Sequence, residues 1–88
     1  VDCSKPVLLD FWESCCAPCM MQSPVVDAIA EEHPEIKVGK VNVDEQPELA
    51  SAFAVESIPT LVIIRDGVTK EILVGLHSKE QILEQFEG

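Results

Sequence analysis

Basic residues and long apolar runs are scarce in this sequence. Its 88 residues include six lysines and arginines against sixteen aspartates and glutamates, a net charge of −10. A surface of that sign repels nucleic-acid phosphates and anionic membrane lipids, so we expect neither as a partner. No apolar run approaches the length of a membrane span. No repeat, linker or low-complexity stretch is visible, which predicts a single domain (residues 1–88). No signal peptide is visible either, although one could have been removed before Val1, and we expect the protein in the cytoplasm.

The composition favours a packed core, because 47% of the residues are hydrophobic. Four cysteines could suggest a framework of disulfides, but Cys15, Cys16 and Cys19 lie within five positions and cannot join distant elements. We expect Cys3, near the N-terminus, to be a free thiol. A regulatory thiol that can be oxidised is the alternative there.

A pair of cysteines two residues apart, Cys16 and Cys19, lies where an apolar run ends and a helical pattern begins. The first turn of a helix has unpaired backbone N–H groups and the positive end of the helix dipole, which both favour a thiolate. Pro18 suits a first turn, where its missing N–H costs little. The thiolate is the attacking species in thiol–disulfide exchange, so this junction is a candidate redox site.

Asp10 interrupts the apolar run from Val7 to Trp12, which otherwise reads as a buried central strand. A carboxylate in such a strand is costly unless it is paired or protonated, and burial would raise its pKa. Asp10 could simply face a wet edge. The functional alternative is a proton donor and acceptor below the cysteine pair.

The remaining patterns predict a mixed α/β fold. A helix is expected from Cys16 to about His33, and alternation predicts a strand over 36–43. The later signals are a short helix from Pro47, a loop over 55–60, strands over 61–64 and 71–74 joined by an Asp66-Gly67 hairpin, and a last helix after a Ser78/Gln81 capping box. The long crossover makes the first two strands parallel, and helices should cover both faces of the sheet.

These motifs together resemble the thioredoxin family. The active-site match is Val7-Leu8-Leu9-Asp10-Phe11-Trp12 followed by Cys16-Ala17-Pro18-Cys19. Further matches follow in the family's order: Lys40-Val41-Asn42-Val43-Asp44, Ile58-Pro59-Thr60-Leu61, Asp66-Gly67 and Gly75. The resemblance implies a thioredoxin-like three-layer α/β/α sandwich with a mixed central sheet of about four strands. It also implies a protein-disulfide reductase that carries electrons in cell redox homeostasis.

The resemblance assigns roles to individual residues. It implies a redox disulfide between Cys16, the nucleophile, and Cys19, the resolving cysteine. Asp10 would transfer a proton to and from Cys19, and Lys40 would lie near Asp10 and tune it. The implied substrate groove comprises Trp12, Ala17, Pro18, Ile58, a cis Pro59 and Gly75, a glycine expected to allow close backbone approach. No cofactor or metal is implied. The partners would be protein disulfides and a thioredoxin reductase-type electron donor, and we expect a monomer.

The sequence departs from the family in a few places. Cys15 replaces a tryptophan, Ala17 a glycine, and Met20 a residue that is commonly basic. We expect Met20 and Met21 to be packing residues. Thioredoxins also have a strand and a helix before the strand that begins here at Val7. Without them, the strand over 36–43 is expected to be an exposed edge.

Three other functions stay open at this point. The same fold could act as a disulfide oxidant or isomerase, which its reduction potential would reveal. Cys15, Cys16 and Cys19 could supply three ligands to zinc or iron, which elemental analysis would detect. A non-catalytic binding module could use the groove near Pro59, in which case a Cys16→Ser variant would remain active.

Overall fold

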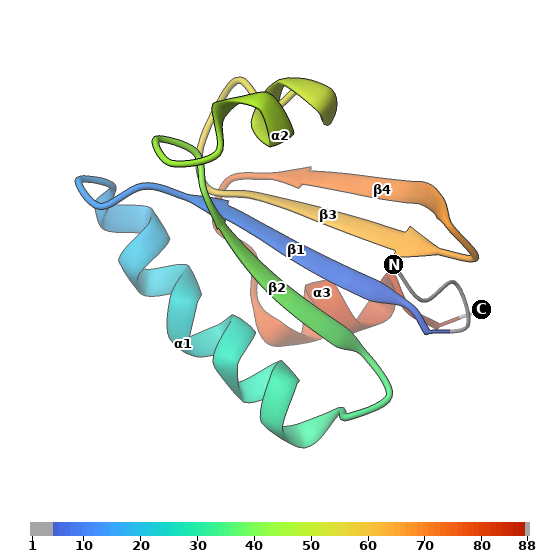
Figure 1. The fold of residues 1–88 in the computed structure, drawn as a ribbon. Coiled ribbons are helices and arrows are strands. Elements are labelled where there is room, and N and C mark those ends of the chain that lie inside the picture. The colour runs from blue at the N-terminus through green and yellow to red at the C-terminus, as the bar shows by residue number, and fades with distance from the viewer. Residues whose placement is uncertain (1–4, 88) are drawn as a thin grey trace.

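The apolar run that follows Pro6 forms an inner strand of a four-stranded sheet. A computed structural model describes residues 5–87 (Figure 1), so the expectation for Cys3 lies outside the described residues. The inner strand is β1 (Val7–Trp12), and the strand order is β2-β1-β3-β4. Because β1 has a neighbour on each side, its backbone hydrogen bonds are made within the sheet. The predicted buried central strand is confirmed.

The sheet is mixed, as the crossover and the hairpin signal predict. Strand β2 (Lys37–Asn42) pairs with β1 in parallel, whereas β3 (Thr60–Arg65) pairs with it antiparallel. Strand β4 (Val68–Val74) runs antiparallel to β3. In the described part of the chain, β2 and β4 are therefore the two edges. The edge position predicted for the strand over 36–43 is confirmed.

The hairpin between β3 and β4 turns at Asp66 and Gly67, as predicted from the Asp-Gly pair. Both residues have positive φ, 56° and 75°. A two-residue turn of this kind matches the twist of the strands it joins, and it requires residues that tolerate a left-handed backbone. This local chemistry sets the register of β4 against β3 next to the turn, and an irregularity between Ile63 and Ile64 shifts the register beyond it.

Three helices lie on the two faces of the sheet. Helix α1 (Ala17–Glu32) and helix α3 (Lys79–Glu84) cover one face, and α2 (Pro47–Ala52) lies at the other (Figure 1). Prolines stand in the first turns of α1 and α2, where the missing N–H costs little. The predicted capping box of α3 is present, with both Ser78–Gln81 hydrogen bonds. The three-layer α/β/α arrangement is confirmed.

The core is divided by the sheet into two clusters. On the side of α1 and α3 the fully buried side chains include Leu8, Ile29 and Ile82. On the side of α2 they include Phe11 and Val62, with Ala50 of α2 packed against them. Residues alternate between faces along a strand, so β1 contributes to both clusters.

The two methionines after the cysteine pair are not packing residues, and this prediction is wrong. Met20 and Met21 are 69% and 63% exposed. The buried positions of α1 are Cys19, Gln22, Val26 and Ile29. These positions are three or four residues apart and define the inward side of the helix. Positions 20 and 21 fall outside that stripe.

None of the helices in residues 5–87 is long and apolar enough to cross a membrane.

Replacing Ile29 by Ala tests the core beneath α1. Ile29 is fully buried, so Ile29→Ala should lower the free energy of unfolding by about 2–5 kcal/mol through lost burial and a residual cavity. The matched control is Ile72→Ala on β4, where the side chain is 42% exposed and the cost should be about 1 kcal/mol or less. Urea unfolding measures both, and equal costs would contradict this assignment of the core.

Candidate redox site

The cysteine pair lies at the start of α1, as its position in the sequence predicts. Cys16 and Cys19 form a disulfide, with Cα atoms 5.2 Å apart. Cys16 is the N-cap residue of α1, and its Sγ accepts a hydrogen bond of 3.2 Å from the backbone N–H of Cys19. The Cys19 N–H belongs to the first helical turn and has no partner within the helix, so it donates to this sulfur instead. The same donor would stabilise a Cys16 thiolate when the pair is reduced.

Burial distinguishes the three neighbouring cysteines. Cys19 is 3% exposed and Cys16 is 8% exposed, whereas Cys15 is exposed and is not in a disulfide. Ala17 and Pro18, in the first turn, are also exposed. A partner can therefore approach Cys16 over the first turn more easily than it can reach Cys19.

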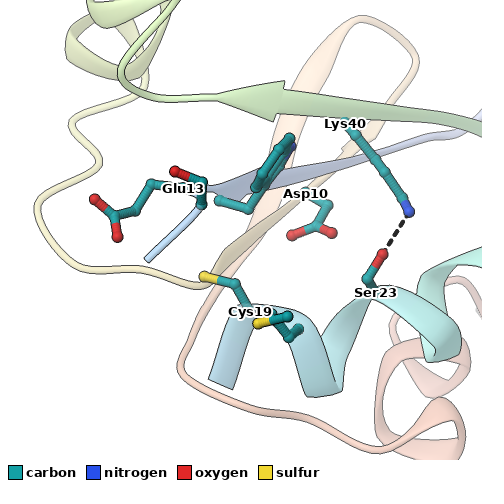
Figure 2. Close-up of a pocket in the computed structure, with 8 residues that line it drawn as sticks. Asp10, Glu13, Cys19, Ser23 and Lys40 are labelled. Carbon is teal, nitrogen blue, oxygen red and sulfur yellow. Dashed lines mark hydrogen bonds between the residues drawn. The ribbon is translucent and has the colours of Figure 1, made fainter. Parts of the chain in front are cut away.

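A pocket of about 380 Å³ lies behind the disulfide (Figure 2). Its lining residues come from the end of β1, the loop that follows, the first turns of α1, and β2: Asp10, Trp12, Glu13, Ser14, Cys19, Met20, Ser23 and Lys40. Figure 2 shows the Asp10 carboxyl facing the side of α1 that carries Cys19 and Ser23. The structure thus brings Asp10, Cys19, Trp12 and Lys40 together around one pocket.

Asp10 is buried inside the sheet and does not face a wet edge. It is 1% exposed, and its Oδ1 has no hydrogen-bond partner within residues 5–87. Burial raises the pKa of the Asp10 carboxyl to about 6, while the charge of Lys40 lowers it and that of Asp27 raises it. A carboxyl group that titrates near neutral pH can both take up and release a proton under working conditions.

Lys40 lies beside Asp10 but makes its contacts elsewhere. The two residues are directly opposite in the parallel register of β1 and β2. The Lys40 ammonium donates to Ser23 Oγ at 2.6 Å and forms an ion pair with Asp27 Oδ1 at 2.6 Å. Ser23 and Asp27 were not among the predicted site residues, although their spacing of four residues places them on one side of a helix.

The other residues of the predicted groove are not among those that line this pocket. The Ile58-Pro59 peptide bond is cis, as the resemblance implies. The carbonyl oxygen of Pro59 accepts a hydrogen bond of 2.8 Å from the N–H of Gly75, which joins these two positions. Within the described chain, a Cβ at Gly75 would meet nothing within 4 Å. Its φ of +92° already favours glycine there, independently of any neighbour in the chain.

The side-chain amide of Gln22, which was not among the predicted site residues, holds the segment after Gly75. Gln22 is fully buried on α1, accepts from the backbone N–H of His77 at 2.8 Å and donates to its carbonyl at 3.0 Å. The ring of His77 in turn hydrogen-bonds the Gly75 carbonyl at 2.9 Å. These polar contacts link α1 to Gly75, one of the residues of the predicted substrate groove. The sequence signal for this contact was a polar glutamine at one of the inward-facing positions of α1, where a partner for its amide is required.

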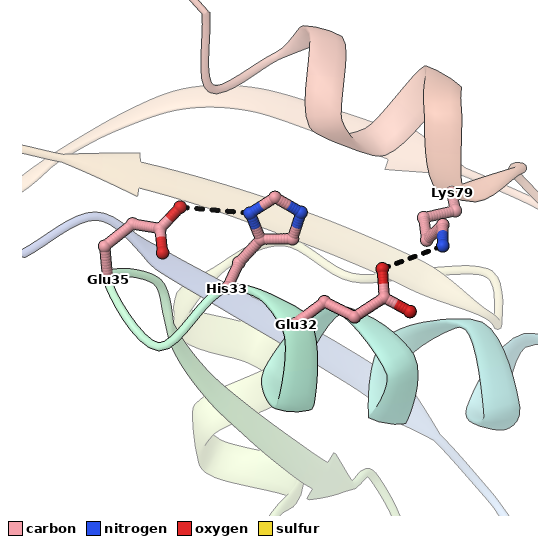
Figure 3. A network of polar contacts seen from close by, with 4 residues as sticks. All are labelled: Glu32, His33, Glu35 and Lys79. Carbon is pink, nitrogen blue, oxygen red and sulfur yellow. Dashed lines mark hydrogen bonds and ion pairs between the residues drawn. The ribbon is translucent and has the colours of Figure 1, made fainter.

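The polar contacts at the far end of α1 lie outside the site (Figure 3). Lys79 of α3 pairs with Glu32 at 2.9 Å, and His33 contacts Glu35 at 3.0 Å. The Lys79–Glu32 pair connects α1 with α3 at the surface, whereas the His33–Glu35 contact is local to the end of α1. Across residues 5–87, no cluster of three or more His, Cys, Asp or Glu side chains is arranged to hold a metal ion.

Comparisons with known proteins agree with the geometry. The family model named Thioredoxin matches residues 1–87. Thioredoxin 1 of Synechococcus elongatus is 49% identical over 88 residues, which cover 99% of this chain and 82% of that protein. The thioredoxin of Alicyclobacillus acidocaldarius is 46% identical over 83 residues, covering 93% and 79%. A solved mutant thioredoxin from Halobacterium salinarum NRC-1 is 41% identical, with a TM-score of 0.87 over 92% of this chain and 71% of that one.

The burial of Asp10 predicts a pH-dependent loss of stability. A pKa raised from 3.8 to about 6 means that the folded protein binds the proton more tightly than the unfolded chain. Stability from this group is therefore fully present below about pH 4 and is lost as the pH rises through 6, by about 3 kcal/mol in total. Unfolding of the oxidised protein by urea at pH 4 to 8, compared with Asp10→Asn, measures the difference. Parallel pH profiles of the two proteins would contradict it.

Removing the Gln22 amide should destabilise the loop it holds. Gln22→Leu leaves the His77 N–H and carbonyl without their partner, at a cost of about 1–3 kcal/mol. Gln46→Leu is the matched control, since Gln46 is exposed and its side chain makes no capping hydrogen bond to α2. Amide hydrogen exchange at His77 should accelerate only in Gln22→Leu. Unchanged exchange there would show that the amide does not hold the loop.

Proposed function

Since the chain belongs to the thioredoxin family and is a thiol–disulfide oxidoreductase with protein-disulfide reductase activity, we propose that Cys16 is its nucleophile and Cys19 its resolving cysteine. The hydrogen bond from the Cys19 N–H to Cys16 Sγ carries this proposal. It gives Cys16, rather than Cys19, the stabilising donor of the helix terminus. The smaller exposure of Cys19 agrees with an internal second attack.

The reaction follows as two exchanges. The Cys16 thiolate attacks one sulfur of a substrate disulfide, so that a mixed disulfide forms and the other substrate sulfur leaves as a thiolate. Cys19 then loses its proton and attacks Cys16 Sγ, which releases the second substrate thiolate and forms the Cys16–Cys19 disulfide. Two electrons pass to the substrate, and its two thiolates take up protons.

Asp10 is the proposed proton acceptor for the second exchange. Burial disfavours a charged thiolate at Cys19, so a base within the same pocket is needed. Asp10 lines that pocket, and its pKa of about 6 leaves most of it ionised at pH 7 and ready to accept a proton. Lys40, opposite Asp10 in β2, tunes this group.

Six residues are proposed to form the substrate groove. Trp12, Ala17 and Pro18 surround the cysteine pair, and the hydrogen-bonded pair Pro59 and Gly75 forms the second part with Ile58. An extended substrate segment would pair with the backbone of Ile58 in the manner of an added strand, which gives affinity without demanding one side-chain sequence. Protein disulfides that lie in different sequences would therefore be accepted as substrates.

We also propose the partners, the cellular location and the oligomeric state of the protein. Members of the family act on protein disulfides and depend on a reductase, so a thioredoxin reductase-type donor would return Cys16 and Cys19 to the dithiol form. We place the protein in the cytoplasm as a monomeric electron carrier for redox homeostasis. The net charge of −10 supports the absence of nucleic-acid and membrane partners.

Serine variants of the three neighbouring cysteines test these roles. Cys16→Ser should reduce insulin disulfides at below about 1% of the wild-type rate, because a hydroxyl does not replace the thiolate. Cys19→Ser should accumulate a mixed disulfide at Cys16, visible by mass spectrometry. Cys15→Ser is the control and should stay within about twofold of wild type, as Cys15 lies outside the redox disulfide. A mixed disulfide at Cys19 in a Cys16→Ser protein that retains activity would reverse the assignment.

A further inference from the structure

The ammonium group of Lys40 is held by the cysteine helix although it could pair with Asp10. Lys40 and Asp10 occupy opposite positions in the parallel pairing of β1 and β2. The ammonium nevertheless contacts Ser23 Oγ and Asp27 Oδ1, each at 2.6 Å, and Figure 2 shows it directed toward Ser23. A buried carboxyl therefore lies next to a cation that is engaged elsewhere.

The spacing of residues along α1 explains how the helix reaches Lys40. Cys19, Ser23 and Asp27 are four residues apart, so they lie in a row along one side of the helix. Cys19 and Ser23 line the pocket together with Lys40, and Asp27 follows one turn further on. The helix that carries the cysteines thus also carries the groups that hold the cation.

The position of that cation decides whether Asp10 is paired. The charged or titratable groups around Asp10 are Lys40 from β2, Asp27 and Cys19 from α1, and Glu13 from the loop after β1, while Leu61 faces it in the register of β3. Lys40 is the cation among them, and Asp10 Oδ1 lacks a hydrogen bond within the described chain. An ammonium paired with Asp10 would favour the carboxylate and oppose its protonation.

We propose that Asp27 and Ser23 are positioning residues that hold the Lys40 ammonium on α1 and so leave the Asp10 carboxylate free to take the proton from Cys19. This inference rests on the proton-acceptor role proposed above for Asp10. In the second exchange the proton moves from Cys19 Sγ to an Asp10 oxygen, and the new thiolate attacks Cys16 Sγ. If Asp27 is neutral, Lys40 is released toward Asp10 and makes it a weaker base.

The charges of Lys40 and Asp27 shift the pKa of Asp10 in the directions that this proposal requires. The charge of Lys40 lowers the pKa of Asp10 and the charge of Asp27 raises it. Asp27 can act in two ways, directly through its own field or indirectly by holding Lys40. Removing Lys40 separates these two contributions, since only the direct one then remains.

A double-mutant cycle measures the indirect contribution. The proteins are wild type, Asp27→Asn, Lys40→Met and the double variant, and the pKa of Asp10 is read from its carboxyl carbon resonance by NMR in the oxidised form. Asp27→Asn should lower the proton affinity of Asp10 by about tenfold, one pKa unit, in wild type and by less than about threefold in Lys40→Met. Ser23→Ala should lower it by a smaller factor than Asp27→Asn.

The matched control is Glu31→Gln, which removes an acidic charge from an exposed position of α1 that does not line the pocket. It should leave the pKa of Asp10 unchanged. Equal effects of Asp27→Asn in both backgrounds would show that Asp27 acts by its own field only, and no effect in either would show that it does not act at all. Either result overturns the proposal.

A kinetic measurement separates this proposal from the role of Asp10 itself. Resolution of a mixed disulfide between Cys16 and a peptide thiol is followed by stopped flow from pH 5 to 8. Asp27→Asn should move the midpoint of this pH profile downward and slow resolution at pH 7, with less change in the Lys40→Met background. If Asp10→Asn resolves the mixed disulfide at the wild-type rate, Asp10 is not the acceptor, whereas the NMR cycle still reports whether Asp27 positions Lys40.

Discussion

Strand β1 is hydrogen-bonded along both edges and packed on both faces, and the other elements are arranged around this constraint. It pairs with β2 and β3, and its side chains enter the core clusters on either side of the sheet. A strand in this position has to be short and apolar. The loop after its end leads to the start of α1, where the Cys19 N–H of the first helical turn donates to Cys16 Sγ. The redox disulfide is thus attached to the most constrained part of the fold.

Asp10 is a buried carboxyl group in the otherwise apolar strand β1, and its burial has a free-energy cost that the proposed mechanism uses. A carboxyl group that is buried without a hydrogen bond to Oδ1 destabilises the folded protein when it is ionised. The same burial raises its pKa to about 6, which suits the proposed role of Asp10 as the base for Cys19. Full pairing with Lys40 would relieve the cost and remove the benefit. The Lys40 ammonium instead contacts Ser23 and Asp27, which under our proposal leaves the Asp10 carboxylate able to take up a proton.

Most of the fold could be predicted because its signals are local. The apolar run before Cys16, the Asp66-Gly67 turn and the Ser78 capping box each act over a few residues, and the structure has an element or turn at each. The site was predicted less completely. Met20 and Met21 are apolar in type but fall outside the inward stripe of α1. Gly75 is required by its backbone angle, which residue type alone does not distinguish from close packing.

The sequence by itself determined the elements, their order and the redox pair, since periodicity, turn residues and the position of cysteines at a helix start act over short distances. Only the tertiary structure decided which groups meet at the site. Gln22 binds His77, 55 residues away, and the Lys40 ammonium pairs with Asp27 of α1 although Asp10 is opposite it in the neighbouring strand. Such choices depend on how a helix lies against a sheet. A local pattern leaves that placement open, because several polar partners would satisfy the same side chain equally well.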